Sequence, residues 1–123
     1  MKEIVAIIRS NKVNVTKAAL DSIGYPGMTG FAVLGRGKQR GIAGECGFSI
    51  ASEVLAKAQT AGMKFIPKRL LIVVVADEDV DRVVSAIVSV NQTNQIGDGR
   101  IFVCPVEEAV RVRTGETGDK AIL

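Results

Sequence analysis

The apolar run at residues 70–75 (LLIVVV) constrains the fold most. Such a run is rich in β-branched residues and too short for a typical helix, so it predicts a strand over residues 69–76. Residues 4–8 (IVAII) predict a second strand of the same kind. A sheet built from uniformly apolar strands must have both of its faces covered. We therefore expect helices on one face and association with another molecule through the other face.

Two segments show the periodicity of amphipathic helices. Apolar residues recur at helical spacing over residues 13–23, with Asn14 as the expected N-cap and Gly24 as a left-handed C-terminal stop. The same spacing returns over residues 80–88, behind an acidic first turn for which Asp77 is the expected N-cap. These two helices are the expected cover for one face of the sheet.

The order of the elements defines the fold class. We expect further strands at residues 28–34 and 100–104, a short final strand at 109–113, and a mobile polar tail over about 114–123. The chain is then a single α+β domain over residues 1–123. Its expected fold is a ferredoxin-like βαββαβ sandwich with a long loop between strands 2 and 3 and a short extra C-terminal strand.

The connection between the second and third strands, about residues 38–66, is too long for a compact domain. Connections usually take about 4–6 residues, and those beyond about 15 are functional or disordered. Glycines recur in its first half, and apolar residues at helical spacing predict a helix over residues 50–61 that forms in only one state. An ordinary short helix packed on the core is the alternative.

Two glycine turns carry positive charges and are candidates for binding phosphate. Residues 35–41 (GRGKQRG) combine three glycines with three cations, and residues 97–100 (GDGR) form the second turn. Glycine lets a backbone approach a phosphate closely, and backbone N–H groups and cations neutralise its charge. Arg111 and Arg113 would share one face of the final strand and could clamp a phosphate. A basic hinge, a helix-to-strand turn and a solvated edge are the alternatives for these three segments.

Composition narrows the class of protein. The chain has no histidine, which excludes histidine-based catalysis and metal sites, and it shows no constellation of nucleophile and base, so we expect no enzyme. Two well-separated cysteines, Cys46 and Cys104, are expected as reduced thiols in a cytoplasmic protein. No stretch reaches the ~18 apolar residues of a membrane span. Aromatic residues make up 4% of the chain, which argues against a platform for stacking nucleic-acid bases.

The chain contains the strings KEI and AII (residues 2–4 and 6–8), GMT (27–29), IGDGRIFV (96–103) and VRVRTGE (110–116). Together these strings resemble the PII signal-transduction family of nitrogen regulators. They cover nearly the whole chain outside the long loop, and the two C-terminal strings are the most specific. A long loop without tyrosine, together with the GRGK root of the loop and a CPVEE run, is similar to the nitrogen-fixation-linked (nif-associated) PII-like subfamily.

The resemblance implies a homotrimer whose sheets face inward around a three-fold axis. It also implies that ATP or ADP binds in the clefts between subunits. The nucleotide-binding residues that the resemblance implies are Thr29, Gly35, Gly37, Lys38, Val74, Gly97, Asp98, Gly99 and Arg100 on one wall, with Arg111 and Arg113 reaching the phosphates from the neighbouring subunit.

In such proteins 2-oxoglutarate binds beside the triphosphate and shares a Mg²⁺ ion with it. The residues that match this effector site are Arg9, Gln39, Gly41 and Lys68, and Gln39 also occupies the position that coordinates the metal. From the sequence alone, an ordinary edge-strand position for Lys68 is the alternative. Binding of the effector would fix the root of the loop and so change which loop conformers exist.

Members of the nif-associated subfamily work as a pair of paralogues that inhibit dinitrogenase, and 2-oxoglutarate relieves the inhibition. The resemblance thus implies dinitrogenase as the target and a paralogous PII-like subunit as a candidate partner. Tyr25 is the only tyrosine and lies outside the loop, so the loop tyrosine that some family members have uridylylated is absent. The alternatives are control of an ammonium channel or of a nitrogen-assimilation enzyme and, from another class, a ferredoxin-like RNA-binding module, because residues 100–103 (RIFV) faintly resemble an RNA-recognition strand.

Overall fold

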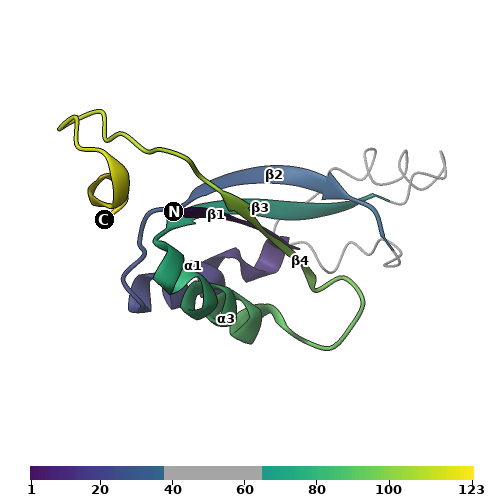
Figure 1. The fold of residues 1–123 in the computed structure, drawn as a ribbon. Helices are drawn as coiled ribbons and strands as arrows, with labels where there is room; N and C mark the ends of the chain where they lie inside the picture. Colours follow the sequence, from purple (N-terminus) through teal and green to yellow (C-terminus); the bar gives the residue numbers. More distant parts are fainter. Residues whose placement is uncertain (38–64) are drawn as a thin grey trace.

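Four antiparallel strands form a sheet in the part of the chain that the computed structural model describes, residues 1–37 and 65–123 (Figure 1). Their order across the sheet is β2-β3-β1-β4, so the two strands with the most apolar sequences take the centre. This order confirms the predicted ferredoxin-like fold, in which β3 is inserted between β1 and β2. The strands span Lys2–Arg9 (β1), Thr29–Gly35 (β2), Ile66–Val75 (β3) and Gly99–Pro105 (β4).

Two helices cover one face of this sheet. α1 (Val13–Ser22) and α3 (Val80–Asn91) lie below the sheet in Figure 1 and pack against each other. Their apolar stripes meet the alternate residues of β1 and β3 that point toward them, as the strand period of two requires. The core between the two layers consists of Ile4, Ala6, Ile8, Leu20, Tyr25, Leu71, Val73, Val75, Val83 and Ile87.

The opposite face of the sheet carries no helix of the described residues, and it is apolar (Figure 1). The strand register places Val5, Ile7, Phe31, Leu70 and Phe102 on this face, which we call the open face. Phe31 and Phe102 are 50% and 46% exposed. An apolar surface of this kind marks a site of association with another molecule.

The N-terminal caps predicted for the two helices are wrong. A 3-10 turn (Ser10–Lys12) leads directly into α1, so Asn14 lies inside the helix and does not cap it. A second 3-10 turn (Asp77–Asp79) leads into α3 in the same way. Asp77 instead contacts the α-amino group of Met1 at 2.9 Å. In α3 the 3-10 turn supplies a backbone partner for the first helical N–H, because the Val80 N–H donates to the Asp77 carbonyl.

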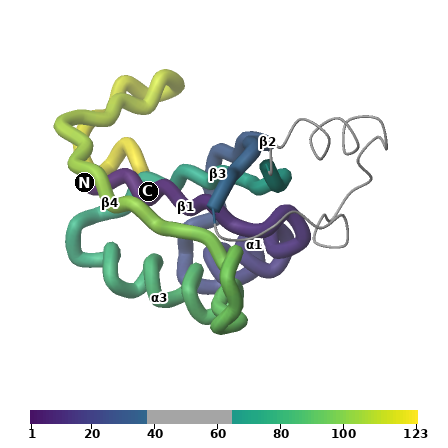
Figure 2. Tube along the Cα trace, turned by 90° about the vertical axis from the view of Figure 1, so that its right-hand side faces the viewer, coloured from purple at the N-terminus to yellow at the C-terminus, as the bar shows by residue number. Residues whose placement is uncertain are grey.

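The C-terminal segment differs from its prediction. The short strand expected over residues 109–113 is present only as one isolated bridge, between Val110 and Thr117. Residues 114–123, expected to form a mobile tail, instead turn back and end in a 3-10 helix (Gly118–Ala121). Figures 1 and 2 both place this C-terminal arm, residues 106–123, at the end of the sheet away from the junction of β2 with the grey trace.

Candidate functional site

Both glycine turns open onto one pocket at one end of the sheet. The strand register brings the two turns to this end. Gly35 pairs with Ile66, Gly99 pairs with Ile8, and the next residue of β1, Arg9, pairs with Lys68. The pocket has a volume of about 550 Å³. Its lining residues are Ile7, Gly35, Arg36, Gly37, Ile66, Lys68, Ile96, Gly97, Gly99, Arg100 and Phe102.

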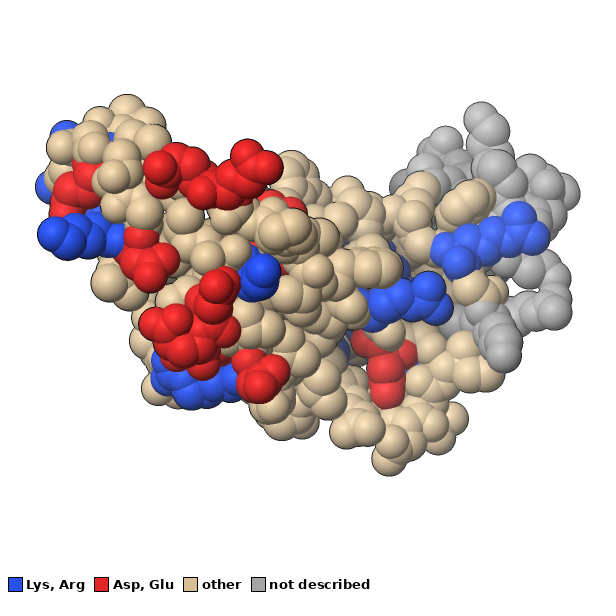
Figure 3. All heavy atoms as spheres, in the orientation of Figure 1, with Lys and Arg blue, Asp and Glu red and all other residues tan. Residues whose placement is uncertain are grey.

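The charge of this pocket suits an anion. Arg36, Lys68 and Arg100 are the three cationic residues among its described lining, which contains no carboxylate. Figure 3 shows basic side chains at this end of the molecule, whereas most of the acidic side chains visible on that face lie toward the other end. Cations and glycine backbones together form the kind of concave site that binds phosphate groups.

Lys68 is the most enclosed of the three cations. Its residue is 7% exposed, and its Nζ donates a hydrogen bond to the Gly97 carbonyl at 2.7 Å. β3 lies between β2 and β1, so the alternative that made Lys68 an edge-strand lysine is wrong. A lysine amine kept this far from water needs strong acceptors, and the carboxylate of a ligand would be a stronger one than a carbonyl.

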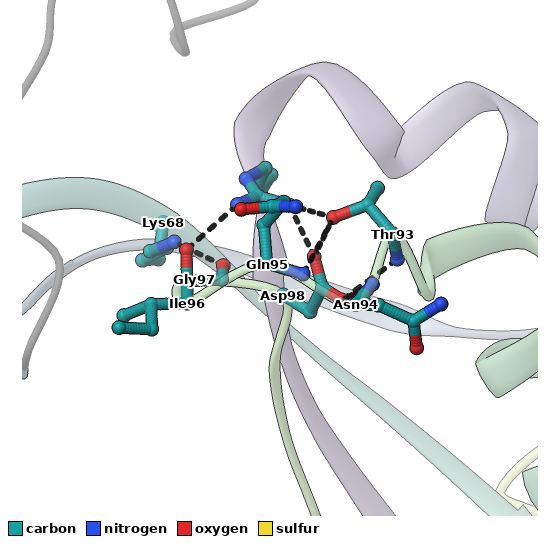
Figure 4. A network of polar contacts seen from close by, with 8 residues as sticks. Lys68, Thr93, Asn94, Gln95, Ile96, Gly97 and Asp98 are labelled. Atoms are coloured by element: carbon teal, nitrogen blue, oxygen red, sulfur yellow. Dashed lines mark hydrogen bonds and ion pairs between the residues drawn. The ribbon is translucent and has the colours of Figure 1, made fainter.

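The turn that leads from α3 into β4, residues 92–98, forms the back of the site (Figure 4). The Asp98 carboxylate accepts hydrogen bonds from the backbone N–H groups of Thr93 at 2.7 Å and Asn94 at 3.0 Å, and from the Thr93 hydroxyl at 2.5 Å. Arg9 adds an ion pair, with 2.5 Å between its Nη1 and Oδ1 of Asp98. Burial by itself would raise the pKa of Asp98, but the hydrogen bonds from Thr93 and the charge of Arg9 lower it to about 2.

This lowered pKa predicts how acid affects stability. A carboxyl group with a pKa below its ordinary value of 3.8 stabilises the fold fully above that pH, and the contribution is lost as the pH falls toward about 2. We expect Asp98→Asn to lower the free energy of unfolding by about 2 kcal/mol at neutral pH, and the difference from the wild type to shrink below about pH 4. Urea unfolding across this pH range measures it. A difference that does not depend on pH would show that the Asp98 charge does not stabilise the fold.

Within one chain, the structure does not bring all the expected residues to this pocket. Thr29 pairs with Ile72 and Val74 with Glu3, so both lie toward the other end of the sheet, although on the open face. Three further expected residues, Lys38, Gln39 and Gly41, lie outside the described residues, and so does the helix expected over residues 50–61.

Arg111 and Arg113 lie on the C-terminal arm, away from the pocket of their own chain (Figures 1 and 2). Arg111 donates to Glu116 Oε1 at 2.9 Å, to the Lys120 carbonyl at 2.9 Å and to the Leu123 carbonyl at 2.5 Å. Arg113 is exposed. The two side chains therefore do not share the face of a strand, which was the expected geometry for a clamp.

Two polar residues of the site, Arg36 and Thr93, were not among the predicted site residues. Arg36 lines the pocket, and the Thr93 hydroxyl and N–H both bind Asp98. Arg36 stands within the basic glycine run, so the signal for it was present in the sequence. Thr93 precedes Asp98 by five residues, a spacing at which a carboxylate can bond back to the amides of a turn.

Two further observations concern metal binding and membrane spans. Within residues 1–37 and 65–123, no group of three or more Cys, Asp or Glu side chains is arranged to hold a metal ion. The expected Mg²⁺ ligand, Gln39, falls outside these residues. None of the helices in the described part of the chain is both long enough and apolar enough to cross a membrane.

Comparison with known proteins identifies the family. The sequence model described as "Nitrogen regulatory protein P-II" matches residues 1–116. The chain is 59% identical over 122 residues to "Nitrogen fixation nifHD1 region GlnB-like protein 2" of Methanosarcina barkeri, with 99% of each chain covered. It is 55% identical over 123 residues to "Nitrogen fixation nifHD region GlnB-like protein 2" of Methanobacterium ivanovii, with both chains fully covered. "Nitrogen regulatory protein P-II" of Cereibacter sphaeroides is 41% identical over 122 residues, covering 99% of this chain and 100% of that one. The resemblance in the strand and turn strings is thereby confirmed, and the chain belongs to the family of nitrogen regulatory protein P-II.

Proposed function

We propose that this chain is a cytoplasmic regulator of nitrogen fixation that binds ATP or ADP, Mg²⁺ and 2-oxoglutarate, and that it inhibits dinitrogenase until 2-oxoglutarate relieves the inhibition. It acts by binding and not by catalysis. The pocket carries this proposal, because it joins two glycine turns and three cations beside the ends of the long loop. The link to nitrogen fixation rests on relatives whose names place them in nitrogen-fixation regions.

The nucleotide end of the site is proposed at the glycine turns. The backbones of residues 35–37 and 97–99 would face the phosphates, and Arg36 and Arg100 would neutralise their charge. Lys38, as the next residue of the first turn, is proposed to add a third cation there. The Asp98 carboxylate would stabilise the second turn, because it accepts hydrogen bonds from the Thr93 and Asn94 N–H groups.

A homotrimer would complete this site. The open face is apolar and partly exposed, so burying it between subunits would be favourable. Thr29 and Val74 lie on that face at the end opposite the pocket, and Arg111 and Arg113 lie on the arm at the same end. We propose that these four residues meet the pocket of a neighbouring subunit. A paralogous PII-like chain could take the place of one neighbour.

The effector end of the site is proposed beside the phosphates. We place 2-oxoglutarate near Arg9, Gln39, Gly41 and Lys68, with Gln39 also holding Mg²⁺. A carboxylate of 2-oxoglutarate would replace the Gly97 carbonyl as the partner of Lys68 Nζ. Because Gly37 and Ile66 flank the long loop and line the pocket, occupancy of the pocket would restrict the loop at both of its ends.

The proposal predicts the behaviour of a Lys68→Met variant. Dinitrogenase should co-precipitate with the wild-type protein in the presence of Mg-ATP and dissociate when 2-oxoglutarate is added. The variant should bind dinitrogenase equally well, but its release should require at least about tenfold more 2-oxoglutarate, because it lacks one charge-assisted bond. Titration calorimetry should show the same loss for 2-oxoglutarate with nearly unchanged ATP affinity.

Lys17, which is exposed on α1, supplies the matched control: Lys17→Met should behave as the wild type. Equal release of the wild type and Lys68→Met by 2-oxoglutarate would place the effector elsewhere. Failure of the wild type to bind dinitrogenase at any effector level would refute that target. Control of an ammonium channel or of a nitrogen-assimilation enzyme would then be favoured.

A further inference from the structure

Arg9 is a deeply buried charge at the end of β1, and three of its contacts run to one turn. The residue is 8% exposed. Its Nη1 lies 2.5 Å from Asp98 Oδ1 and 3.3 Å from the Thr93 hydroxyl, and its Nη2 donates to the Ile96 carbonyl at 3.0 Å. The guanidinium therefore ties the end of β1 to the beginning, middle and end of the turn between α3 and β4.

This turn has a backbone that needs support. Asn94 has a φ of +63° and Gly97 a φ of +102°. A residue other than glycine is strained in the left-handed region unless its surroundings hold it there. Asp98 supplies part of that support by accepting the N–H of Asn94 at 3.0 Å (Figure 4), and Arg9 holds Asp98. The ion pair thus helps to hold the turn in this conformation.

The other side of the same turn forms the wall of the pocket. Gly97 and Gly99 line it, and the Gly97 carbonyl receives the hydrogen bond from Lys68 Nζ. Neither Arg9 nor Asp98 is among the described residues that line the pocket. Both lie behind the turn, where they can set the positions of the glycine backbone and of Lys68.

We propose that the partly buried ion pair between Arg9 and Asp98 is a positioning device for the pocket: it fixes the turn so that the Gly97–Gly99 backbone and Lys68 are preorganised for a phosphate-bearing ligand. Arg9 then acts on the nucleotide pocket through Asp98. This inference rests on the proposed nucleotide function. Preorganised groups bind more tightly because no conformational entropy is lost when the ligand binds.

The test is a double-mutant cycle on the full-length protein. Arg9→Met, Asp98→Asn and the double variant are compared for Mg-ATP affinity by calorimetry, at a temperature where circular dichroism shows each to be folded. Each single variant should weaken ATP binding about tenfold, and the double variant should be no weaker than either, as expected for two residues that act as one unit. In the ligand-free protein, amide hydrogen exchange at residues 93–98 should rise by a similar factor in all three.

A loss of general stability is separated by a matched arginine. Arg82 does not line the pocket; it forms an ion pair with Asp79, with 3.0 Å between the two groups. Arg82→Met should therefore leave ATP affinity and hydrogen exchange at residues 93–98 unchanged. If Arg9→Met does not fold, Thr93→Val removes one hydrogen bond to Asp98 and should give the same pattern in weaker form.

Three results would overturn the proposal. Arg9→Met could weaken 2-oxoglutarate binding alone, with ATP affinity and local exchange unchanged, which would make Arg9 a direct ligand. The losses of the two single variants could add in the double variant, which would show that they act independently. Exchange at residues 93–98 could stay at the wild-type level. If the wild type bound no nucleotide, the proposed function would fail. Amide hydrogen exchange at residues 93–98 in the three variants would still decide whether Arg9 positions the turn.

Discussion

Replacing Gly99 by alanine should lower the free energy of unfolding by roughly 3–5 kcal/mol, a large share of the ~5–15 kcal/mol that stabilises a typical domain. A Cβ atom at this position would lie 1.9 Å from the carbonyl oxygen of Ile7, which belongs to the backbone of β1. Gly99 also has a φ of +116°, in the region that side chains rarely adopt. The strain cannot be relieved by rotating a side chain, so β1 and β4 must separate locally.

Urea unfolding followed by circular dichroism measures this loss, and Gly27→Ala is its matched control. Gly27 has open space around the position of a Cβ atom, and its φ is not positive. Alanine there should change the stability by less than about 1 kcal/mol, with stabilisation favoured because the unfolded chain loses freedom. If Gly99→Ala were as stable as Gly27→Ala, the close approach of β4 to Ile7 would be incorrect.

The double variant Arg111→Ala with Arg113→Ala should lose ATP binding by at least about 100-fold. Two charge-assisted bonds to phosphates are worth about 1.5–3 kcal/mol each, and each 1.4 kcal/mol is a factor of ten in affinity. The fold should survive, because both arginines lie on the C-terminal arm and neither belongs to the core. Calorimetry with Mg-ATP measures the affinity, and circular dichroism confirms the folded state.

The contacts of Arg111 make single variants informative. Arg111→Ala should also loosen the arm, since the side chain holds Glu116 and the Lys120 and Leu123 carbonyls. Arg113 is exposed, so Arg113→Ala should weaken ATP binding without that effect. Glu116→Gln keeps both arginines and weakens the tie, so it should bind ATP at least as well as the wild type. ATP affinity that is unchanged in the double variant would remove both arginines from the site.

Local sequence patterns predicted the elements whose causes are local. The apolar runs became β1 and β3, and Gly24 takes the expected left-handed conformation after α1, with a φ of +91°. The two glycine turns were identified from composition, and both line the pocket. In each case the chemistry of a few neighbouring residues decides the conformation, so no distant contact was needed to predict it.

The failures lie where a distant part of the chain decides the outcome. The Asp77 side chain bonds to the α-amino group of Met1 and does not cap the start of α3. Lys68 was compatible with an edge strand until the pairing of β3 with both neighbours was known. Arg111 bonds within the arm, because Gly115 and Gly118 reverse the chain there with φ values of +72° and +69°.

The sequence by itself determined the strand-helix-strand order, the apolar character of both sheet faces and the two glycine turns that could bind phosphate. Only the tertiary structure decided that Gly35, Lys68, Gly97 and Arg100 line one pocket, and that Arg9 lies behind it in an ion pair with Asp98. The physical reason is sequence separation. Strand register joins Arg9 to Lys68, and the ion pair joins residues 89 positions apart. Such contacts depend on how the whole sheet pairs, and no short stretch of the chain encodes that pairing.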